Sequence, residues 1–307
     1  ISLYLACACR STRLWFWPNT HLHSGTPPLF WLIATCMLSF GFGQLWKWSQ
    51  RRGLSAPIVV PTNYLTIALT LMLYFAWSGT LYFPPMVLLV GSATGLSFIV
   101  SMLVMTHALE KARVGVVLTS FRLAILVPIV YSILVWGETA STLQYLGIGL
   151  ALVSLVLMTW QPSAHQDTNS ANPLPLMLAI FLLQGISHCC LRWIHYAGLD
   201  EQRMQVLCIT ALSAGLLGAL FALYRGLKPR ARDLGMGIGI GLFNLVALGA
   251  TLTALSLFPG TVFFPLNGSA VVMLDNLCAQ YIWRETQSRL GLIGVAFGIV
   301  SMLLIFQ

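Results

Sequence analysis

Apolar residues follow one another in long runs along this chain, and charged residues or Pro and Gly interrupt them only at intervals. From Gly53 to Leu109 there is no Asp, Glu, Lys or Arg, and a stretch of this length can cross a bilayer twice at about 20 residues per helix. Dividing the chain at its interruptions predicts ten membrane-spanning helices. Their limits are 28–47, 57–79, 85–108, 113–136, 142–160, 174–197, 204–224, 234–256, 261–283 and 289–306.

The composition excludes a soluble globule and predicts a lipid bilayer as the surroundings. Apolar residues make up 58% of the 307 residues and charged residues 8%, so too little polar surface is present to cover a soluble core. The net charge of +8 does not indicate a nucleic acid partner, because the basic residues stand at the ends of apolar runs, as membrane anchors do. The seven cysteines are odd in number and mostly lie in apolar runs. We expect no disulfide framework, metal site or cofactor.

A repeat divides the predicted helices into two groups of five. The sequence "VWGETASTLQYLG" at 135–147 returns 147 positions later as "IWRETQSRLGLIG", and Pro28 with Pro175 and Trp46 with Trp193 match at the same offset. A polar linker separates the two groups. The predicted units are an N-terminal arm at 1–27, a first five-helix repeat at 28–160, a linker at 161–173 and a second five-helix repeat at 174–307.

Because five is odd, the second repeat must enter the membrane upside down, and the basic residues test this. In all four pairs of equivalent loops, one loop carries several basic residues and its partner carries one or none. Eleven basic residues lie on the side of the first, third, seventh and ninth loops, against three on the side of the termini. The positive-inside rule therefore places the termini outside, and it explains why Gly137 becomes Arg284 in the second repeat.

Small residues recur at helical spacing in two of the predicted helices. Gly91-x-x-x-Gly95 lies in 85–108, and Gly237-x-x-x-Gly241 lies in 234–256. This spacing lets two helix backbones approach closely in lipid. The "GMGIGIG" stretch at 235–241 has no preceding strand, so helix packing is favoured over a dinucleotide-binding loop.

The inverted repeat resembles the drug/metabolite transporter superfamily, in particular its ten-helix EamA-like members. The residues that carry the resemblance are Pro128, "WGET" and Gly147 in the first half, and "FFPLNGSAVVMLDNLCAQYIWRET" with Gly294 in the second. The resemblance implies an all-α integral membrane protein and a secondary transporter rather than an enzyme. It implies alternating access of a small organic metabolite through a central cavity between the repeats, coupled to protons or by exchange. Family members usually keep both termini in the cytoplasm, in contrast to the charge count here.

We expect the protein in the cytoplasmic (inner) membrane of a bacterium, as a monomer or homodimer. Two other classes of protein, an intramembrane enzyme and a structural or regulatory protein, stay open as alternatives to a transporter. An intramembrane aspartyl protease needs two membrane aspartates where only Asp275 qualifies, and a bis-His haem site would have to use His107, His188 and His195, which lie at different depths. A structural or regulatory protein that only associates through its glycine-lined faces is the third class.

Two charges lie deep inside predicted helices, where an unpaired charge costs several kcal/mol. Arg122 lies about 13 Å and Asp275 about 12 Å from the basic side at 1.5 Å per residue. These similar depths on equivalent helices predict an ion pair between Arg122 and Asp275. The pair could bind solute, or it could only staple two helices together.

The predicted helix 174–197 carries a polar stripe. Gln184, His188, Arg192 and His195 are spaced so that they project from one face. His188 could bind substrate or relay a proton, whereas Arg192 and His195 could instead reach the membrane interface. If Asp275 neutralises Arg122, the remaining positive charge on this helix favours an anionic or zwitterionic solute.

Three further features complete the candidate site. In "FFPLNGSAV" at 263–271, Pro265 and Gly268 predict an interrupted helix beside Asn267, with a simple kink as the alternative. Asn244 could bind solute or make an interhelical hydrogen bond, and Glu138 and Glu285 are expected to cap helices or set topology. The predicted substrate-binding residues are Arg122, Asp275, His188, Gln184, Arg192, Asn244 and Asn267.

Overall fold

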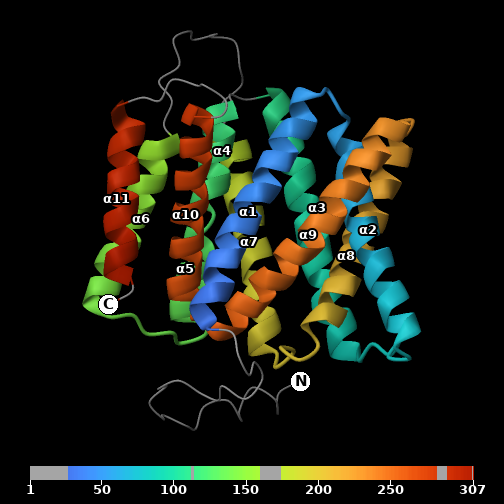
Figure 1. Ribbon diagram of the computed structural model, residues 1–307, viewed down its shortest axis with the longest axis horizontal. Helices are drawn as coiled ribbons and strands as arrows, with labels where there is room; N and C mark the ends of the chain where they lie inside the picture. The colour runs from blue at the N-terminus through green and yellow to red at the C-terminus, as the bar shows by residue number, and fades with distance from the viewer. Residues whose placement is uncertain (1–26, 112–113, 160–173, 282–288, 306) are drawn as a thin grey trace.

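The computed structural model describes residues 27–111, 114–159, 174–281, 289–305 and 307. The regular structure in these residues is α-helical (Figure 1). The helices are α1 (Pro28–Arg51), α2 (Ala56–Trp77), α3 (Pro85–Lys111), α4 (Val114–Leu123), α5 (Leu126–Leu134), α6 (Thr142–Thr159), α7 (Leu174–Tyr196), α8 (Arg203–Tyr224), α9 (Ala231–Leu257), α10 (Gly260–Tyr281) and α11 (Arg289–Ile305).

Length and composition fit a membrane. Seven of the described helices are long and apolar enough to cross a bilayer, and three shorter apolar segments accompany them, at Ser120–Leu134, Thr142–Leu157 and Leu292–Ile305. Large apolar side chains remain exposed on many helices, including Leu69, Leu73 and Trp77 of α2. In water such a surface would be unfavourable, whereas in lipid it is in contact with acyl chains. The chain is an integral membrane protein.

The helices lie where the sequence predicts them, but two prolines differ from the expectation. The predicted helix 113–136 is divided into α4 and α5, with a break at Ala124 and Ile125. Pro128 has no N–H to donate to the carbonyl of Ala124, so the helix ends and restarts with the proline in its first turn. The interruption predicted at Pro265 was wrong, because α10 continues through this residue. The first turn of α10 is held from outside by Glu138, as described below.

Successive helices run in alternating directions, and α5 continues in the direction of α4 (Figure 1). α1 begins and α11 ends at the same end of the bundle, the lower one in Figure 1, which we call the terminal end. The opposite end is called the distal end. The segment 135–141, the end of α7 and the junction between α9 and α10 all lie at the terminal end.

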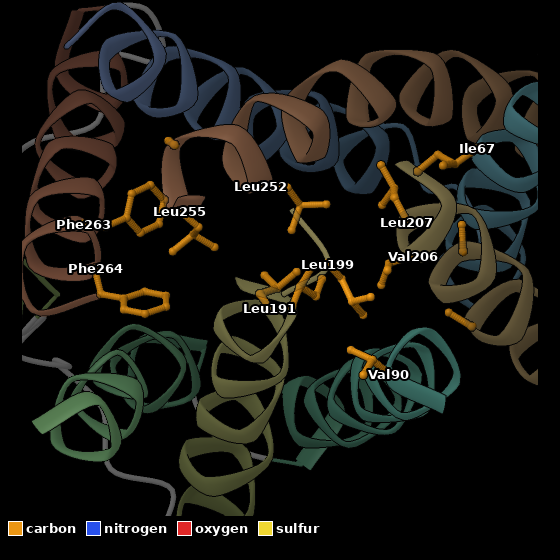
Figure 2. Close-up of a cluster of buried hydrophobic side chains, with 14 of the residues drawn as sticks. Ile67, Val90, Leu191, Leu199, Val206, Leu207, Leu252, Leu255, Phe263 and Phe264 are labelled. Atoms are coloured by element: carbon orange, nitrogen blue, oxygen red, sulfur yellow. The ribbon is translucent and has the colours of Figure 1, made fainter. Parts of the chain in front are cut away.

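Most of the close packing joins the first half of the chain to the second. α2 and α3 both pack against α8, and α9 packs against α1 and α2. α7 packs against α3, α4 and α5, while α6 and α11 pair at one edge of the bundle. Buried side chains of α7, α9 and α10 meet in the core, among them Leu191, Leu255 and Phe264 (Figure 2).

Two of these interfaces depend on the predicted glycine pairs, which the structure confirms. A Cβ added to Gly91 would lie 2.8 Å from Ile209 Cβ, and one added to Gly95 would lie 2.4 Å from the carbonyl oxygen of Thr210 on α8. A Cβ on Gly241 of α9 would lie 2.7 Å from the carbonyl oxygen of Asn63 on α2. Only glycine permits backbones to come this close.

The Gly95→Ala variant is expected to be destabilised by about 1–3 kcal/mol, because the new methyl group would overlap a backbone oxygen that cannot rotate away. Gly149→Ala is the matched control, since a Cβ there meets nothing within 4 Å. Thermal unfolding in detergent should show a lower midpoint for Gly95→Ala and an unchanged or slightly higher one for Gly149→Ala. Equal midpoints for the two variants would contradict the close α3–α8 packing.

Candidate functional site

The predicted ion pair between Arg122 and Asp275 is present. Arg122 lies at the end of α4, just before the break, and its Nη2 is 2.6 Å from Oδ2 of Asp275 on α10. Gln44 of α1 donates from Nε2 to the other carboxylate oxygen at 2.9 Å. Both oxygens of Asp275 are therefore hydrogen-bonded, and three helices from the two halves meet at this carboxylate.

The ion pair is not sealed from its surroundings. The Arg122 and Asp275 side chains are 29% and 24% exposed. Contact of these charges with acyl chains would cost several kcal/mol, so a hydrated setting suits this pair better than a lipid-facing one. Asp275 and Gln44 lie in the last two turns of α10 and α1, and both of these helices end at the distal end (Figure 1). Asp275 and Gln44 therefore lie nearer the distal end than the terminal end.

A second polar group borders the first on α7. Ser101 of α3 donates to Gln184 Oε1 at 2.7 Å, and Gln184 Nε2 lies 3.2 Å from His188 Nε2. The helix α4, which carries Arg122, packs against α7. The structure thus brings four of the predicted residues, Arg122, Asp275, Gln184 and His188, into one neighbourhood.

The His188 ring also links this neighbourhood to α10. It meets the ring of Phe264 edge-on, with centroids 5.7 Å apart. Asn267 and Asp275 follow Phe264 at helical spacing and share its face of α10. The Oδ1 atom of Asn267 is buried and has no hydrogen-bond partner among the described residues. Asn267 therefore keeps an acceptor available on the face that carries Asp275.

Arg192 belongs to a different cluster, so its predicted place in the substrate site needs correction. Its Nη2 is 2.8 Å from Oε1 of Glu138, and the two side chains are only 4% and 8% exposed. Its Nη1 donates to the carbonyl oxygens of Leu255 and Phe258 at the end of α9. Arg192 does not reach the interface, and Glu138 neutralises it. The free positive charge on α7 that favoured an anionic solute is absent.

Glu138 confirms the expectation of a capping role, but the helix that it caps is α10. Its Oε1 accepts from the Gly260 N–H at 3.0 Å and its Oε2 from the Thr261 N–H at 2.9 Å. A carboxylate at a helix N-terminus satisfies free N–H groups and complements the helix dipole. The Tyr196 hydroxyl donates to Oε1 at 2.8 Å. We call Glu138, Arg192 and Tyr196 the Glu138 cluster. Glu285, its counterpart in the repeat, lies outside the described residues.

The pKa of Glu138, in the segment between α5 and α6, is lower than the ordinary 4.5. Burial alone would raise this pKa, but the Arg192 charge and the N–H groups of Thr261 and Gly260 outweigh it. A carboxyl with a lowered folded-state pKa stabilises the fold above its unfolded pKa. That contribution is lost as the pH falls through the lowered pKa.

We therefore expect the thermal stability advantage of the wild type over Glu138→Gln to be constant near neutral pH and to shrink below about pH 4.5. Unfolding midpoints measured from pH 7 down to pH 3 would test this. A difference that stays constant over the whole range would show that the Glu138 charge does not stabilise the fold.

The remaining candidates lie apart from the ion pair. Asn244 of α9 is buried and donates from Nδ2 to Asn63 Oδ1 of α2 at 3.2 Å, which is the interhelical alternative. His195 lies 2.7 Å from Asp200 in the turn after α7. Sequence reasoning missed Gln44, Asn63 and Ser101. Their signal was weak, because a single polar residue in an apolar helix does not reveal its partner.

Comparison with known proteins adds information on the fold alone. No protein-family model matches the chain, and no curated protein matches it. Among solved structures, 28 chains match. One of them, described as "Crystal structure of protein", is 15% identical with a TM-score of 0.72, over 90% of this chain and 95% of that chain. The fold is therefore shared with a protein of low sequence identity.

Proposed function

We propose that the chain is a secondary transporter of the ten-helix drug/metabolite type, which moves a small organic solute between two inverted five-helix halves by alternating access. The observation that carries this proposal is the Arg122–Asp275 ion pair. It joins α4 of the first half to α10 of the second inside the bundle, and it remains partly exposed. Ionisable groups at such a position typically mark a solute or ion path.

The packing supports an inverted repeat if α4 and α5 are counted as one span. If each helix is replaced by its equivalent in the other half, the α3–α8 interface corresponds to the α9–α2 interface. In the same way, the α1–α9 interface corresponds to the α7–α3 interface. Equivalent helices run in opposite directions, as α1 and α7 do (Figure 1). Gly79 and Gly226, which lie 147 positions apart, both follow a helix with positive φ, 69° and 66°. These regularities are typical of duplicated transporter halves.

The proposed solute site consists of Arg122 and Asp275, with Gln184, His188 and Asn267 as hydrogen-bonding neighbours. Asn244 and Arg192 are left out, because each is occupied elsewhere. Since the ion pair is neutral as a whole, a solute that displaced only one partner would leave the other charge unpaired. The site therefore favours a zwitterionic solute over one with only negative charge. We place the protein in a bacterial cytoplasmic membrane, with the basic distal end inside.

Uptake into liposomes tests the proposal. Purified protein in liposomes is exposed to a mixture of metabolites grouped by charge class, and mass spectrometry identifies what has entered. We expect zwitterionic solutes to enter faster than into empty liposomes. A protein that folds and chemically converts a lipid or peptide, but lets no solute enter, would show that it is an enzyme and not a transporter.

A further inference from the structure

We propose that the Glu138 cluster is a latch that holds the terminal end closed and must open in each transport cycle. The inference rests on the proposed function, because only alternating access requires this end to open. The cluster holds a deeply buried ion pair, since the Arg192 and Glu138 side chains are only 4% and 8% exposed, against 29% and 24% for Arg122 and Asp275.

The bonds of the Glu138 carboxylate cross between the halves. Glu138 belongs to the first half, whereas Arg192 and Tyr196 lie on α7 and the capped N–H groups on α10. The other bonds of Arg192, to the carbonyl oxygens of Leu255 and Phe258, stay within the second half. Separation of the halves at this end would therefore release Glu138 and leave the guanidinium with two acceptors. The guanidinium thus keeps hydrogen-bond acceptors when the latch opens.

An apolar layer lies beside the cluster and closes the same end. Phe263 and Phe264 of α10, Leu255 of α9 and Leu191 of α7 are all buried and turn toward one another between these helices (Figure 2). The Arg122–Asp275 pair, in contrast, keeps about a quarter of its surface exposed. The terminal end is thus packed with buried apolar side chains, whereas the Arg122–Asp275 pair is partly exposed.

The setting of Glu138 suits a reversible contact. It lies on the non-helical segment 135–141, after Gly137 with φ of +68°, and Trp136 stacks on Tyr196 with ring centroids 4.5 Å apart. One short segment thus makes the contact through a ring stack and a carboxylate. A buried ion pair often adds little net stability compared with apolar side chains of similar volume. A role in selecting one conformation therefore explains the Glu138–Arg192 pair better than a role in stability alone.

Ser132 provides a reporter position beneath the latch. It is completely buried in the last turn of α5, and its Oγ lies beside Gly260, where an added Cβ would be 2.5 Å away. Ser132→Cys is nearly isosteric. The rate at which a membrane-impermeant maleimide labels the thiol introduced by this substitution, with each cysteine resolved by mass spectrometry, measures how often the terminal end opens.

Glu138→Gln keeps an oxygen for the cap and removes the charge. In the Ser132→Cys background, we expect it to raise the rate of labelling at position 132 about tenfold, as weakening one charge-assisted contact by about 1.4 kcal/mol would do. Glu201→Gln, at an exposed glutamate of the same end, should leave the rate unchanged. Glu138→Asp, which keeps the charge but shortens the reach, should give an intermediate rate and serves if Glu138→Gln does not fold.

Unchanged labelling rates in folded Glu138→Gln and Glu138→Asp would overturn the latch. The Glu138 cluster would then be a permanent structural contact between the halves. The labelling needs no solute, so it is independent of the transport assay. Faster labelling of position 132 without solute uptake would refute the proposal of a transporter, but it would support a contact at Glu138 that opens and closes. Solute uptake with unchanged labelling would refute the latch and keep the transporter.

Discussion

Replacing Arg192 with Met is expected to lower the free energy of unfolding by about 3–5 kcal/mol, the cost of leaving one partner of a buried ion pair alone. The carboxylate of Glu138 would stay buried without its guanidinium, and the carbonyl oxygens of Leu255 and Phe258 would lose their donor. Met fills a comparable volume, so the charge and the hydrogen bonds, rather than a cavity, cause the loss.

Arg225→Met is the matched control, because this arginine is exposed at the end of α8 and lies over the Phe221 ring. Denaturant unfolding in detergent should place Arg192→Met far below the wild type and Arg225→Met within about 0.5 kcal/mol of it. If the two variants unfold alike, the burial of the Glu138–Arg192 pair would be wrong.

Removing either charge of the Arg122–Asp275 pair is expected to weaken solute binding by about 100-fold, which corresponds to about 2.7 kcal/mol. Asp275→Asn leaves Arg122 without its carboxylate, and Arg122→Gln leaves Asp275 with Gln44 and without its guanidinium. Each change deprives a zwitterionic solute of one partner and leaves one charge uncompensated in the bundle.

Solute-induced shifts of the unfolding midpoint measure this loss, because a ligand stabilises the state that binds it. Asn244→Ala is the control. It removes the hydrogen bond to Asn63 and should lower the midpoint without changing the solute-induced shift. Normal shifts in both Asp275→Asn and Arg122→Gln would mean that the pair only holds helices together.

Local patterns were sufficient to predict some features of the structure. Runs of apolar residues set the helix limits, since a membrane imposes a minimum length on each span. The similar depths of Arg122 and Asp275 below the same side predicted their ion pair, which the structure confirms. The close approach at Gly91 and Gly95 followed from the spacing of small residues.

Other features that depend on distant partners could not be predicted. Nothing near Arg192 in the sequence indicates that Glu138, 54 positions away, neutralises it. Pro128 and Pro265 both remove a backbone donor, yet the helix is divided only before Pro128, whereas α10 continues through Pro265. The topology argument for Gly137 was incomplete, since its φ of +68° also favours glycine there.

Counterflow in liposomes tests the central claim, that a solute crosses between the halves at the Arg122–Asp275 pair, most directly. Liposomes loaded with an excess of the solute found in the uptake screen are diluted into a trace of labelled solute. The wild type should accumulate the label transiently, whereas Asp275→Asn and empty liposomes should not. Equal accumulation by the wild type and Asp275→Asn, or none by a folded wild type for any solute that it binds, would contradict the account.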